Sequence, residues 1–303
     1  MNEPNQNSFE VADVIVFNTP PNQLPYWTLR NNLTHSEADI YPFGATVTAW
    51  RIFTNTTAKN LFFVSRKSDL TGMKSIRGGI PIIFPQFHAG ALPTHGFARN
   101  NHWEVIRSNV TADGTPSIAF QLNSSPETRA IWNYQFQAEY QVTLGNELLS
   151  KISITNTGDT EFVFQFALHT YFSVADISAV SIHGLKGLTF IDKTKNCERV
   201  TQKSQDLSLT SHTDSVYLKA PNSLSLTSNR DQTEISITKS GLDDAVVWNP
   251  WAEKVLEIKD MQPDDYKRFV CVEAGQIDNP VILASAKTWS ATQSIASAPK
   301  QEI

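Results

Sequence analysis

The chain has 303 residues, of which 40% are hydrophobic and 18% are charged, a balance typical of a folded globular protein. Its formal net charge of -5 argues against the broad basic face with which proteins hold nucleic acid non-specifically. A small anionic substrate stays compatible with this charge, because two or three local arginines can hold a phosphate. A core of this size needs neither disulfides nor a structural metal for stability.

The two ends of the chain are predicted to be less ordered than the rest. Residues 1–10 are polar and expected to form a disordered tail, residues 298–303 are expected to be a flexible C-terminus, and the polar stretch from Ser290 onward is expected to fray. Between them we find no linker, charge run or repeat, which predicts a single domain over residues 11–297. The absence of an apolar signal segment or membrane span predicts a cytoplasmic protein, expected to be a monomer with no membrane or nucleic-acid partner.

Apolar residues at every other position dominate the middle of the chain, and this spacing is the mark of half-buried strands. The first such run is residues 117–122, and the clearest is 136–144. Gly145-Asn146 then favours a tight hairpin into a return strand over 148–154. A further turn leads into a strand over 162–168, in which Phe162, Phe164, Phe166 and Leu168 share one face.

Further short strands are expected at residues 188–192, 223–227 and 234–238. Many short strands about ten residues apart predict an all-β protein built as a large antiparallel β-sandwich. Helices are expected to be few and short. The two cysteines, Cys197 and Cys271, are not part of a CxxC pair, so no zinc site is expected, and two free core thiols are favoured over a disulfide.

Two glycine-containing stretches carry candidate binding residues. In RGGIPIIFP, Arg77 precedes two glycines that would let the backbone approach a ligand closely, and its guanidinium could bind an oxyanion or sugar hydroxyls. In LPTHGFARN, His95 and Arg99 lie four residues apart. On spacing alone, an ordinary surface turn or loop is the favoured interpretation of either stretch.

Two apolar strands end in candidate acid–base residues. His169 follows an apolar strand, where a partly buried imidazole suits proton transfer but is often only a satisfied core residue. Alternation places Glu273 on the same side as Phe269 and Cys271, where poor solvation would raise its pKa. The alternative is a glutamate at the strand rim, paired with Arg268 or Lys267.

The stretch DDAVVWNPW contains Trp248 and Trp251. Tryptophans suit stacking on a sugar ring, but they also simply fill cores. The core interpretation is favoured for Trp248, and both interpretations stay open for Trp251.

Taken together and in this order, RGGIPIIFPQF, LPTHGFARN, ALHTYF, DDAVVWNPW and FVCVEAGQI resemble the glucose-6-phosphate 1-epimerase family. This is the phosphosugar branch of the aldose 1-epimerase (galactose mutarotase-like) superfamily. The resemblance covers about residues 25 to 295. It implies a large antiparallel β-sandwich with the sugar site in a cleft on one sheet, and an enzyme that interconverts the α and β anomers of glucose 6-phosphate without a metal or other cofactor.

By the same resemblance, His169 protonates the ring oxygen and Glu273 removes the proton from the anomeric hydroxyl. The ring opens to the aldehyde, C1 turns about the C1–C2 bond, and the ring closes on the other face with the two roles exchanged. Such a reaction needs one proton to be removed and one to be supplied. A histidine and a glutamate in different environments are the expected acid and base.

The resemblance also implies four substrate-binding residues: Arg77, His95, Arg99 and Asp214. Both arginines are good phosphate ligands, and the sequence does not choose between them, while Asp214 is expected to bond sugar hydroxyls. This chain departs from the family at Ser215, where many relatives have arginine, and at Thr94, where some have glutamine. His88 and Ala89 lie in a stretch that varies in the family, and no role is assigned to them.

Three other functions remain as alternatives. The first is an aldose 1-epimerase for neutral sugars, and the second is a non-catalytic carbohydrate-binding or regulatory protein on the same fold, since a fold alone does not fix a function. The third is a glycoside hydrolase with Asp214 and Glu273 as its two carboxylates. The presence of both His169 and Glu273 favours an enzyme over a binder, because a binder needs no acid–base pair.

Overall fold

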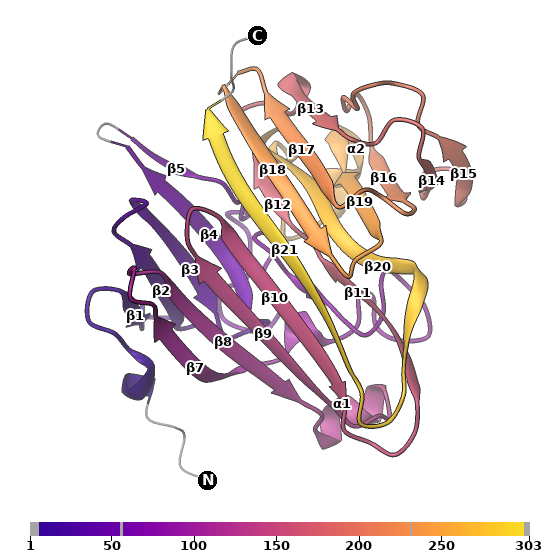
Figure 1. The fold of residues 1–303 in the computed structure, drawn as a ribbon. Helices are drawn as coiled ribbons and strands as arrows, with labels where there is room; N and C mark the ends of the chain where they lie inside the picture. Colours follow the sequence, from indigo (N-terminus) through magenta and orange to yellow (C-terminus); the bar gives the residue numbers. More distant parts are fainter. Residues whose placement is uncertain (1–5, 55–56, 231, 300–303) are drawn as a thin grey trace.

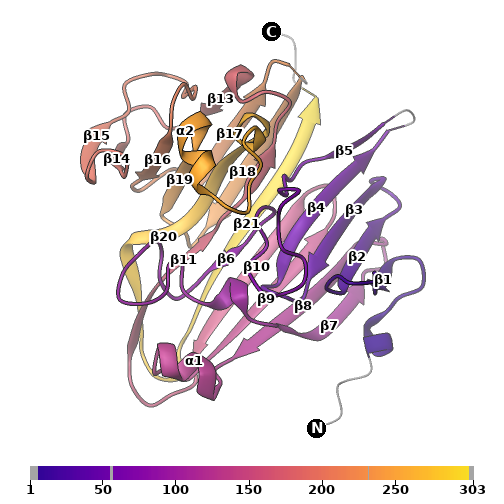
Figure 2. The same cartoon turned by 180° about the vertical axis from the view of Figure 1, so that it is seen from behind.

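The computed structural model describes residues 6–54, 57–230 and 232–299, and it confirms the all-β prediction. Three antiparallel sheets form two layers (Figure 1). One eight-stranded sheet makes up the first layer, and the other two sheets lie side by side in the second, as the view from behind shows (Figure 2). This arrangement is the large β-sandwich that the strand spacing predicted.

The five-stranded sheet consists of the first strands in chain order: β1 (Ile15–Asn18), β2 (Tyr26–Asn31), β3 (Ser36–Tyr41), β4 (Thr46–Phe53) and β5 (Ala58–Asn60).

The sheet of the first layer runs in the order β13 (Val180–His183), β17 (Ser223–Ser228), β18 (Thr233–Ser240), β21 (Thr288–Pro299), β10 (Leu148–Asn156), β9 (Phe136–Leu144), β8 (Pro116–Asn123) and β7 (Glu104–Val110).

The other eight-stranded sheet, which we call the site sheet, contains β15 (Glu198–Thr201), β14 (Thr189–Asp192), β16 (Thr213–Tyr217), β19 (Asp244–Asn249), β20 (Phe269–Leu283), β11 (Phe162–Leu168), β6 (Ile82–Ile83) and, paired with β20, β12 (Tyr171–Ser173).

The helices are few and short, as predicted: the α-helices α1 (Pro126–Ile131) and α2 (Trp251–Lys254), and the 3-10 turns η1 (Gln6–Phe9), η2 (Ala98–Asn100), η3 (Ile177–Ala179), η4 (Val255–Glu257) and η5 (Asp265–Arg268). In the part of the chain that the structure describes, none is long and apolar enough to cross a membrane.

The main core lies between the two layers. Alternate residues of β9 are buried there, and those of β11 face them from the site sheet. Aromatic rings join the layers, since Trp289 of β21 packs against Phe164 and Phe166 of β11. One hydrophobic cluster takes residues from all three sheets.

The expectation of a frayed chain from Ser290 onward is wrong. β21 extends to Pro299 and lies inside its sheet, paired with β10 on one side and β18 on the other. Ala291, Gln293 and Ile295 are buried on its inner face. Because most residues of this stretch are small or polar, apolar and polar residues do not visibly alternate in its sequence. Residues 300–303 of the predicted flexible C-terminus lie outside the described residues.

The predicted tail over residues 1–10 is also shorter than expected. Gln6–Phe9 forms a 3-10 turn, and Phe9 packs against the main core. The carboxylate of Glu10 then accepts a hydrogen bond from the backbone N–H of Phe17. Residues 1–5 lie outside the described residues.

Both cysteines are free, as favoured from the sequence. Cys271 is buried, but Cys197 is exposed, so the expectation of two core thiols is wrong for Cys197. It lies in the turn between β14 and β15 with a positive φ of 62°, a conformation of turns rather than of strands.

Candidate active site

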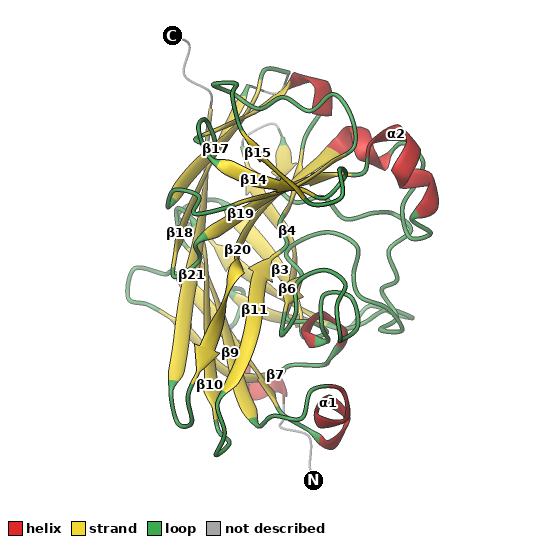
Figure 3. Cartoon of the chain, turned by 90° about the vertical axis from the view of Figure 1, so that its right-hand side faces the viewer, coloured by secondary structure: helices red, strands yellow, loops and turns green. Residues whose placement is uncertain are grey.

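The candidate site lies on the face of the site sheet that points away from the first layer. Figure 3 shows this side of the molecule, where α2 and many of the connecting loops gather. Because successive side chains of a strand point to opposite faces, Val270 and Val272 of β20 enter the main core, whereas Cys271 and Glu273 face outward. This outer face carries two small apolar clusters, one around Val246 and one around Phe269.

A cavity of about 160 Å³ opens on this outer face. Of the six predicted site residues, all except Arg99 line it. The full lining is Arg77, Phe87, His88, Thr94, His95, His169, Asp214, Val246, Trp248 and Glu273. Residues from segments far apart in the sequence thus line one cavity.

His169 follows the last residue of β11, at the point where the chain leaves the strand before β12 begins. Its backbone N–H donates to the carbonyl of Pro81 at 3.0 Å. Its imidazole stacks on the ring of Tyr171, with ring centres 4.7 Å apart, and meets the edge of Trp248 at 5.8 Å. The histidine is therefore a buried residue with a fixed ring orientation, 7% exposed, whose imidazole reaches the cavity.

The two glycines of RGGIPIIFP allow a close approach, but to the protein's own backbone rather than to a ligand. Both have positive φ. A Cβ at Gly78 would lie 2.2 Å from the carbonyl oxygen of Phe63, and one at Gly79 would lie 2.1 Å from that of Val47. Glycine is therefore required at both positions for this segment to pack against the neighbouring backbone. Carbonyl groups of the segment in turn accept hydrogen bonds from the backbone N–H groups of His169 and Tyr171.

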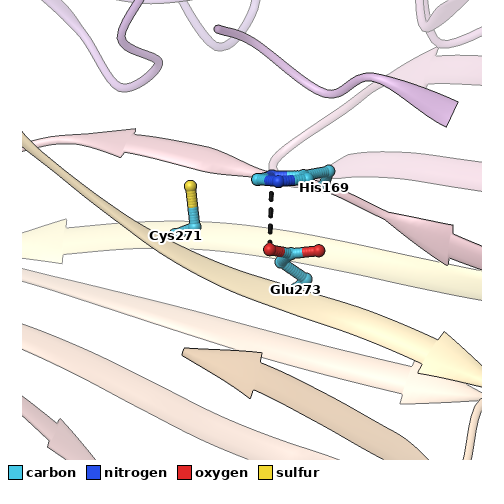
Figure 4. A group of neighbouring side chains, drawn as sticks. All are labelled: His169, Cys271 and Glu273. Atoms are coloured by element: carbon cyan, nitrogen blue, oxygen red, sulfur yellow. Dashed lines mark ion pairs between the residues drawn. The ribbon is translucent and has the colours of Figure 1, made fainter. Parts of the chain in front are cut away.

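Glu273 lies in the middle of the site sheet, directly across from Val246 of β19. It is 2% exposed, and its Oε1 lies 3.3 Å from Nδ1 of His169 (Figure 4). Arg268 instead pairs with Asp264 and Asp265. The alternative of a glutamate at the solvent rim, paired with Arg268, is therefore wrong.

Burial pushes the pKa values of this pair in opposite directions. Desolvation raises the pKa of Glu273 well above its ordinary value, and the charge of Asp214 raises it further. Desolvation lowers the pKa of His169 well below its ordinary value, with additional lowering by His95, Arg99 and Arg77. In the free protein the environment therefore favours a neutral imidazole beside a protonated carboxyl group.

His95 provides a neutral donor. It adopts a positive φ of 67°, and its Nδ1 accepts a hydrogen bond from the backbone N–H of His88 at 3.2 Å. Desolvation, followed by the charges of Arg99, His88 and Arg77, lowers the pKa of His95 to about 3. At neutral pH the proton of its ring must therefore be on Nε2.

The two arginines differ in their partners. Arg77 lines the cavity, donates from Nε to Asp260 at 3.2 Å and donates from Nη1 to the hydroxyl of Tyr171 at 3.3 Å. Arg99 lies outside the cavity lining and donates from Nη2 to the carbonyl of Thr94. Its buried Nε has no hydrogen-bond partner, and no carboxylate of the described residues forms an ion pair with it. Arg77 thus has an ion-pair partner in Asp260, whereas Arg99 has none among the described residues.

Asp214 lies on β16, directly across from Trp248 of β19, so both side chains share the outer face. Burial raises the pKa of Asp214, while His88, Lys193 and His212 act in the opposite direction. The core interpretation of Trp248 needs correction, because this half-buried side chain also lines the cavity. Trp251 does not line it and packs against Tyr266 and the main core.

Sequence reasoning missed Phe87, His88 and Val246 as lining residues. The loop after β6 brings His88 inward, and Gln86 closes this loop by bonding His88 and Leu92. No periodicity marks such a loop. The sequence offered one signal for this loop. Three of the chain's seven histidines, His88, His95 and His169, lie in or next to the stretches that carry the candidate site residues.

Comparison with known proteins gives the site a context. Residues 25–296 match the aldose 1-epimerase family. The chain is 36% identical over 271 residues to a candidate glucose-6-phosphate 1-epimerase of Cenchrus ciliaris, covering 86% of this chain and 82% of the relative. It is 31% identical over 240 residues to a candidate enzyme of the same name from Escherichia coli, covering 78% and 80%.

A solved structure supports the same relationship. The crystal structure of a candidate mutarotase from Salmonella typhimurium superimposes with a TM-score of 0.87 and 26% identity, over 96% of both chains. The fold and the sequence match agree over nearly the whole length. The chain belongs to the aldose 1-epimerase family.

Proposed function

We propose that this protein interconverts the α and β anomers of glucose 6-phosphate, with His169 and Glu273 as the acid–base pair. The observation that carries the proposal is the 3.3 Å contact between these two buried side chains in the wall of one cavity. The names of the relatives from Cenchrus ciliaris and Escherichia coli support the choice of substrate. No change of oxidation state is involved, so a proton donor and a proton acceptor suffice for the chemistry.

The pair holds one transferable proton throughout the reaction. For ring opening, protonated His169 gives its proton to the ring oxygen while ionised Glu273 takes the proton of the anomeric hydroxyl. Opening therefore leaves a neutral imidazole and a protonated carboxyl group. C1 then turns, and in ring closure on the other face Glu273 gives its proton to the carbonyl oxygen while His169 takes the proton of the attacking hydroxyl group.

The electrostatics of the cavity favour the opening half of this cycle. Burial disfavours both the imidazolium and the carboxylate, and proton transfer to and from the sugar removes both charges at once. A positioned acid and a positioned base each contribute about 10²–10⁴-fold to a rate. Stacking on Tyr171 holds the imidazole in place, so little orientation entropy is lost during reaction.

The remaining lining residues suit a phosphorylated sugar. His95 offers a neutral N–H donor, Asp214 offers acceptors for hydroxyl groups, and Trp248 offers an apolar surface. We assign the phosphate to the positive end of the cavity, where Arg77 lies in the wall and the charge of Arg99 also acts on the site. Arg99 has no carboxylate partner among the described residues, so its charge is available to a dianion.

The proposal includes a monomeric, cytoplasmic protein without a resident cofactor. A phosphate monoester carries about -1.5 to -2 charges at pH 7, which confines such a substrate to the aqueous compartment that produces it. Sedimentation analysis of the purified chain and microscopy of a tagged chain would test the two statements. A stable dimer or a membrane-bound fraction would contradict them.

The experiment that tests the reaction is exchange NMR of glucose 6-phosphate with wild type and His169→Ala side by side. Faster exchange between the α and β signals in wild type alone is the expected result. Unaltered exchange with a folded wild-type protein would overturn the proposal and favour a sugar-binding function. The same measurement on glucose separates the alternative of a neutral-sugar epimerase, because equal turnover of both sugars would contradict the phosphate assignment.

A further inference from the structure

The acid–base pair has a third polar neighbour on the outer face of the site sheet, Cys271. Figure 4 shows the thiol on the same side of β20 as Glu273, beside the imidazole of His169. One ligating atom from each of the three residues lies within 4.8 Å of the others, and all three side chains are buried. Imidazole nitrogen, thiolate sulfur and carboxylate oxygen are the three ligand types that zinc takes in proteins.

The separations are close to those of a zinc site. Zinc bonds of about 2.0–2.3 Å in tetrahedral geometry place neighbouring ligand atoms roughly 3.3–3.8 Å apart. The contact between His169 and Glu273 is already 3.3 Å long. The thiol of Cys271 lies within 4.8 Å of the other two ligand atoms, close enough for a side-chain rotation to bring it to ligand distance.

Two polar atoms of the acid–base pair form no hydrogen bond in the described structure, although one of them, Nδ1 of His169, lies 3.3 Å from Oε1 of Glu273. Nδ1 of His169 and Oε2 of Glu273 are buried and have no hydrogen-bond partner among the described residues. Buried polar atoms without partners are rare and call for an explanation. Both residues line the cavity, which gives an ion a way in and leaves a fourth position open to water.

We propose that His169, Cys271 and Glu273 form a Zn²⁺ site that inhibits the protein. The ion takes the imidazole lone pair, the thiolate and the carboxylate, and the protons of the thiol and of any protonated carboxyl group go to solvent. The same atoms exchange protons with the sugar, so metal and sugar compete for them. Only this competition rests on the proposed function; the metal site itself rests on the geometry.

The test uses Co²⁺ as a spectroscopic probe on the full chain, followed by displacement with Zn²⁺. Wild type is expected to show the near-ultraviolet absorption of a cobalt–thiolate bond and the strong visible bands of four-coordinate cobalt. Cys271→Ser should lose the thiolate absorption and bind Zn²⁺ at least about tenfold more weakly, since even loss of an outer contact costs 10–100-fold. Cys197→Ser is the matched control, because that exposed cysteine lies in the turn between β14 and β15 and should leave both signals unchanged.

His169→Ala removes a ligand from a different segment and must also abolish the cobalt signal, which keeps the site testable if Cys271→Ser does not fold. Equal affinity of wild type and both ligand variants, or no thiolate absorption in saturated wild type, would overturn the site. Added Zn²⁺ should slow anomer exchange reversibly in wild type and in Cys197→Ser. A cobalt–thiolate signal in a protein without mutarotase activity would support the metal site while removing the proposed function.

Discussion

Tyr171 connects the proposed phosphate end of the cavity to the proposed catalytic histidine. Its ring stacks on the imidazole of His169 with an angle of 9° between the planes, and its hydroxyl accepts a hydrogen bond from Nη1 of Arg77. Burial raises the pKa of this hydroxyl, so it stays neutral at physiological pH. The side chain of Tyr171 therefore fixes the position of the His169 ring relative to the guanidinium of Arg77.

Tyr171→Phe keeps the stacked ring and removes only the hydroxyl. A hydrogen bond of this kind is worth about 1 kcal/mol, so KM for glucose 6-phosphate is expected to rise about fivefold while kcat changes less than about twofold. Exchange NMR over a range of sugar phosphate concentrations measures both constants. Tyr134→Phe, a tyrosine packed on Trp132 away from the cavity, is the control. A large fall in kcat with unchanged KM would mean that the hydroxyl acts on His169 instead.

Glu273→Gln removes the proposed base with almost no change of shape. Exchange of glucose 6-phosphate is expected to fall by about 10²–10⁴-fold, whereas circular dichroism should be unchanged and sugar phosphate binding should be largely kept. The exposed Glu253 lies on α2, and Glu253→Gln should behave like wild type. Activity near the wild-type rate in Glu273→Gln would remove this residue from the base role.

Strands such as β9, β10 and β11, and the side on which Glu273 lies, could be predicted from the sequence, because both follow from period-two alternation. None of the five strands β1–β5 was predicted. The strand that ends the chain could not be predicted, since Gln293 and Ala291 occupy buried positions where the pattern calls for large apolar residues. Gln293 is accommodated because its amide donates a hydrogen bond to Thr170 across the core.

The cavity as a whole was predictable only through the family resemblance. Its walls come from β16, β19, β20, the segment before β6 and the loops after β6 and β11. Only the pairing of distant strands brings them together. The same pairing places Trp248 beside His169 and Cys271 beside both members of the acid–base pair. Local sequence spacing carries no information on such contacts, which explains why Trp248 was favoured as a core residue and why His88 was given no role.

The arginines should distinguish phosphorylated from neutral sugars. Arg77→Ala or Arg99→Ala is expected to reduce kcat/KM for glucose 6-phosphate by at least about tenfold, because a charge-assisted hydrogen bond contributes about 1.5–3 kcal/mol. Turnover of glucose should change much less. Arg107→Ala, which breaks a surface pair with Glu139 on the first layer, is the control. Equal losses on both sugars would contradict phosphate binding at these residues.

The raised pKa of Glu273 also predicts how stability depends on pH. In the unfolded chain this carboxyl group ionises near its ordinary value of 4.5, whereas in the folded protein burial keeps it protonated well above that pH. Between the two pKa values the folded state holds more protons, so Glu273 makes the protein less stable as the pH rises through this window. His169 acts in the opposite direction below 6.5, since its folded pKa is lowered and the unfolded state then holds the extra proton.

Glu273→Gln isolates the contribution of the carboxyl group, because the amide resembles the protonated acid and does not titrate. The variant is expected to melt at a higher temperature than wild type near neutral pH, and the difference should shrink toward zero as the pH falls to 4.5. Thermal melting of both proteins across this range, followed by circular dichroism, measures the difference. A variant that is less stable than wild type at neutral pH, or a difference that does not vary with pH, would show that Glu273 is held as a carboxylate. The acid–base pair would then be charged before the sugar binds. The free energy that favours ring opening would then have to come from contacts with the sugar instead of from burial of the pair.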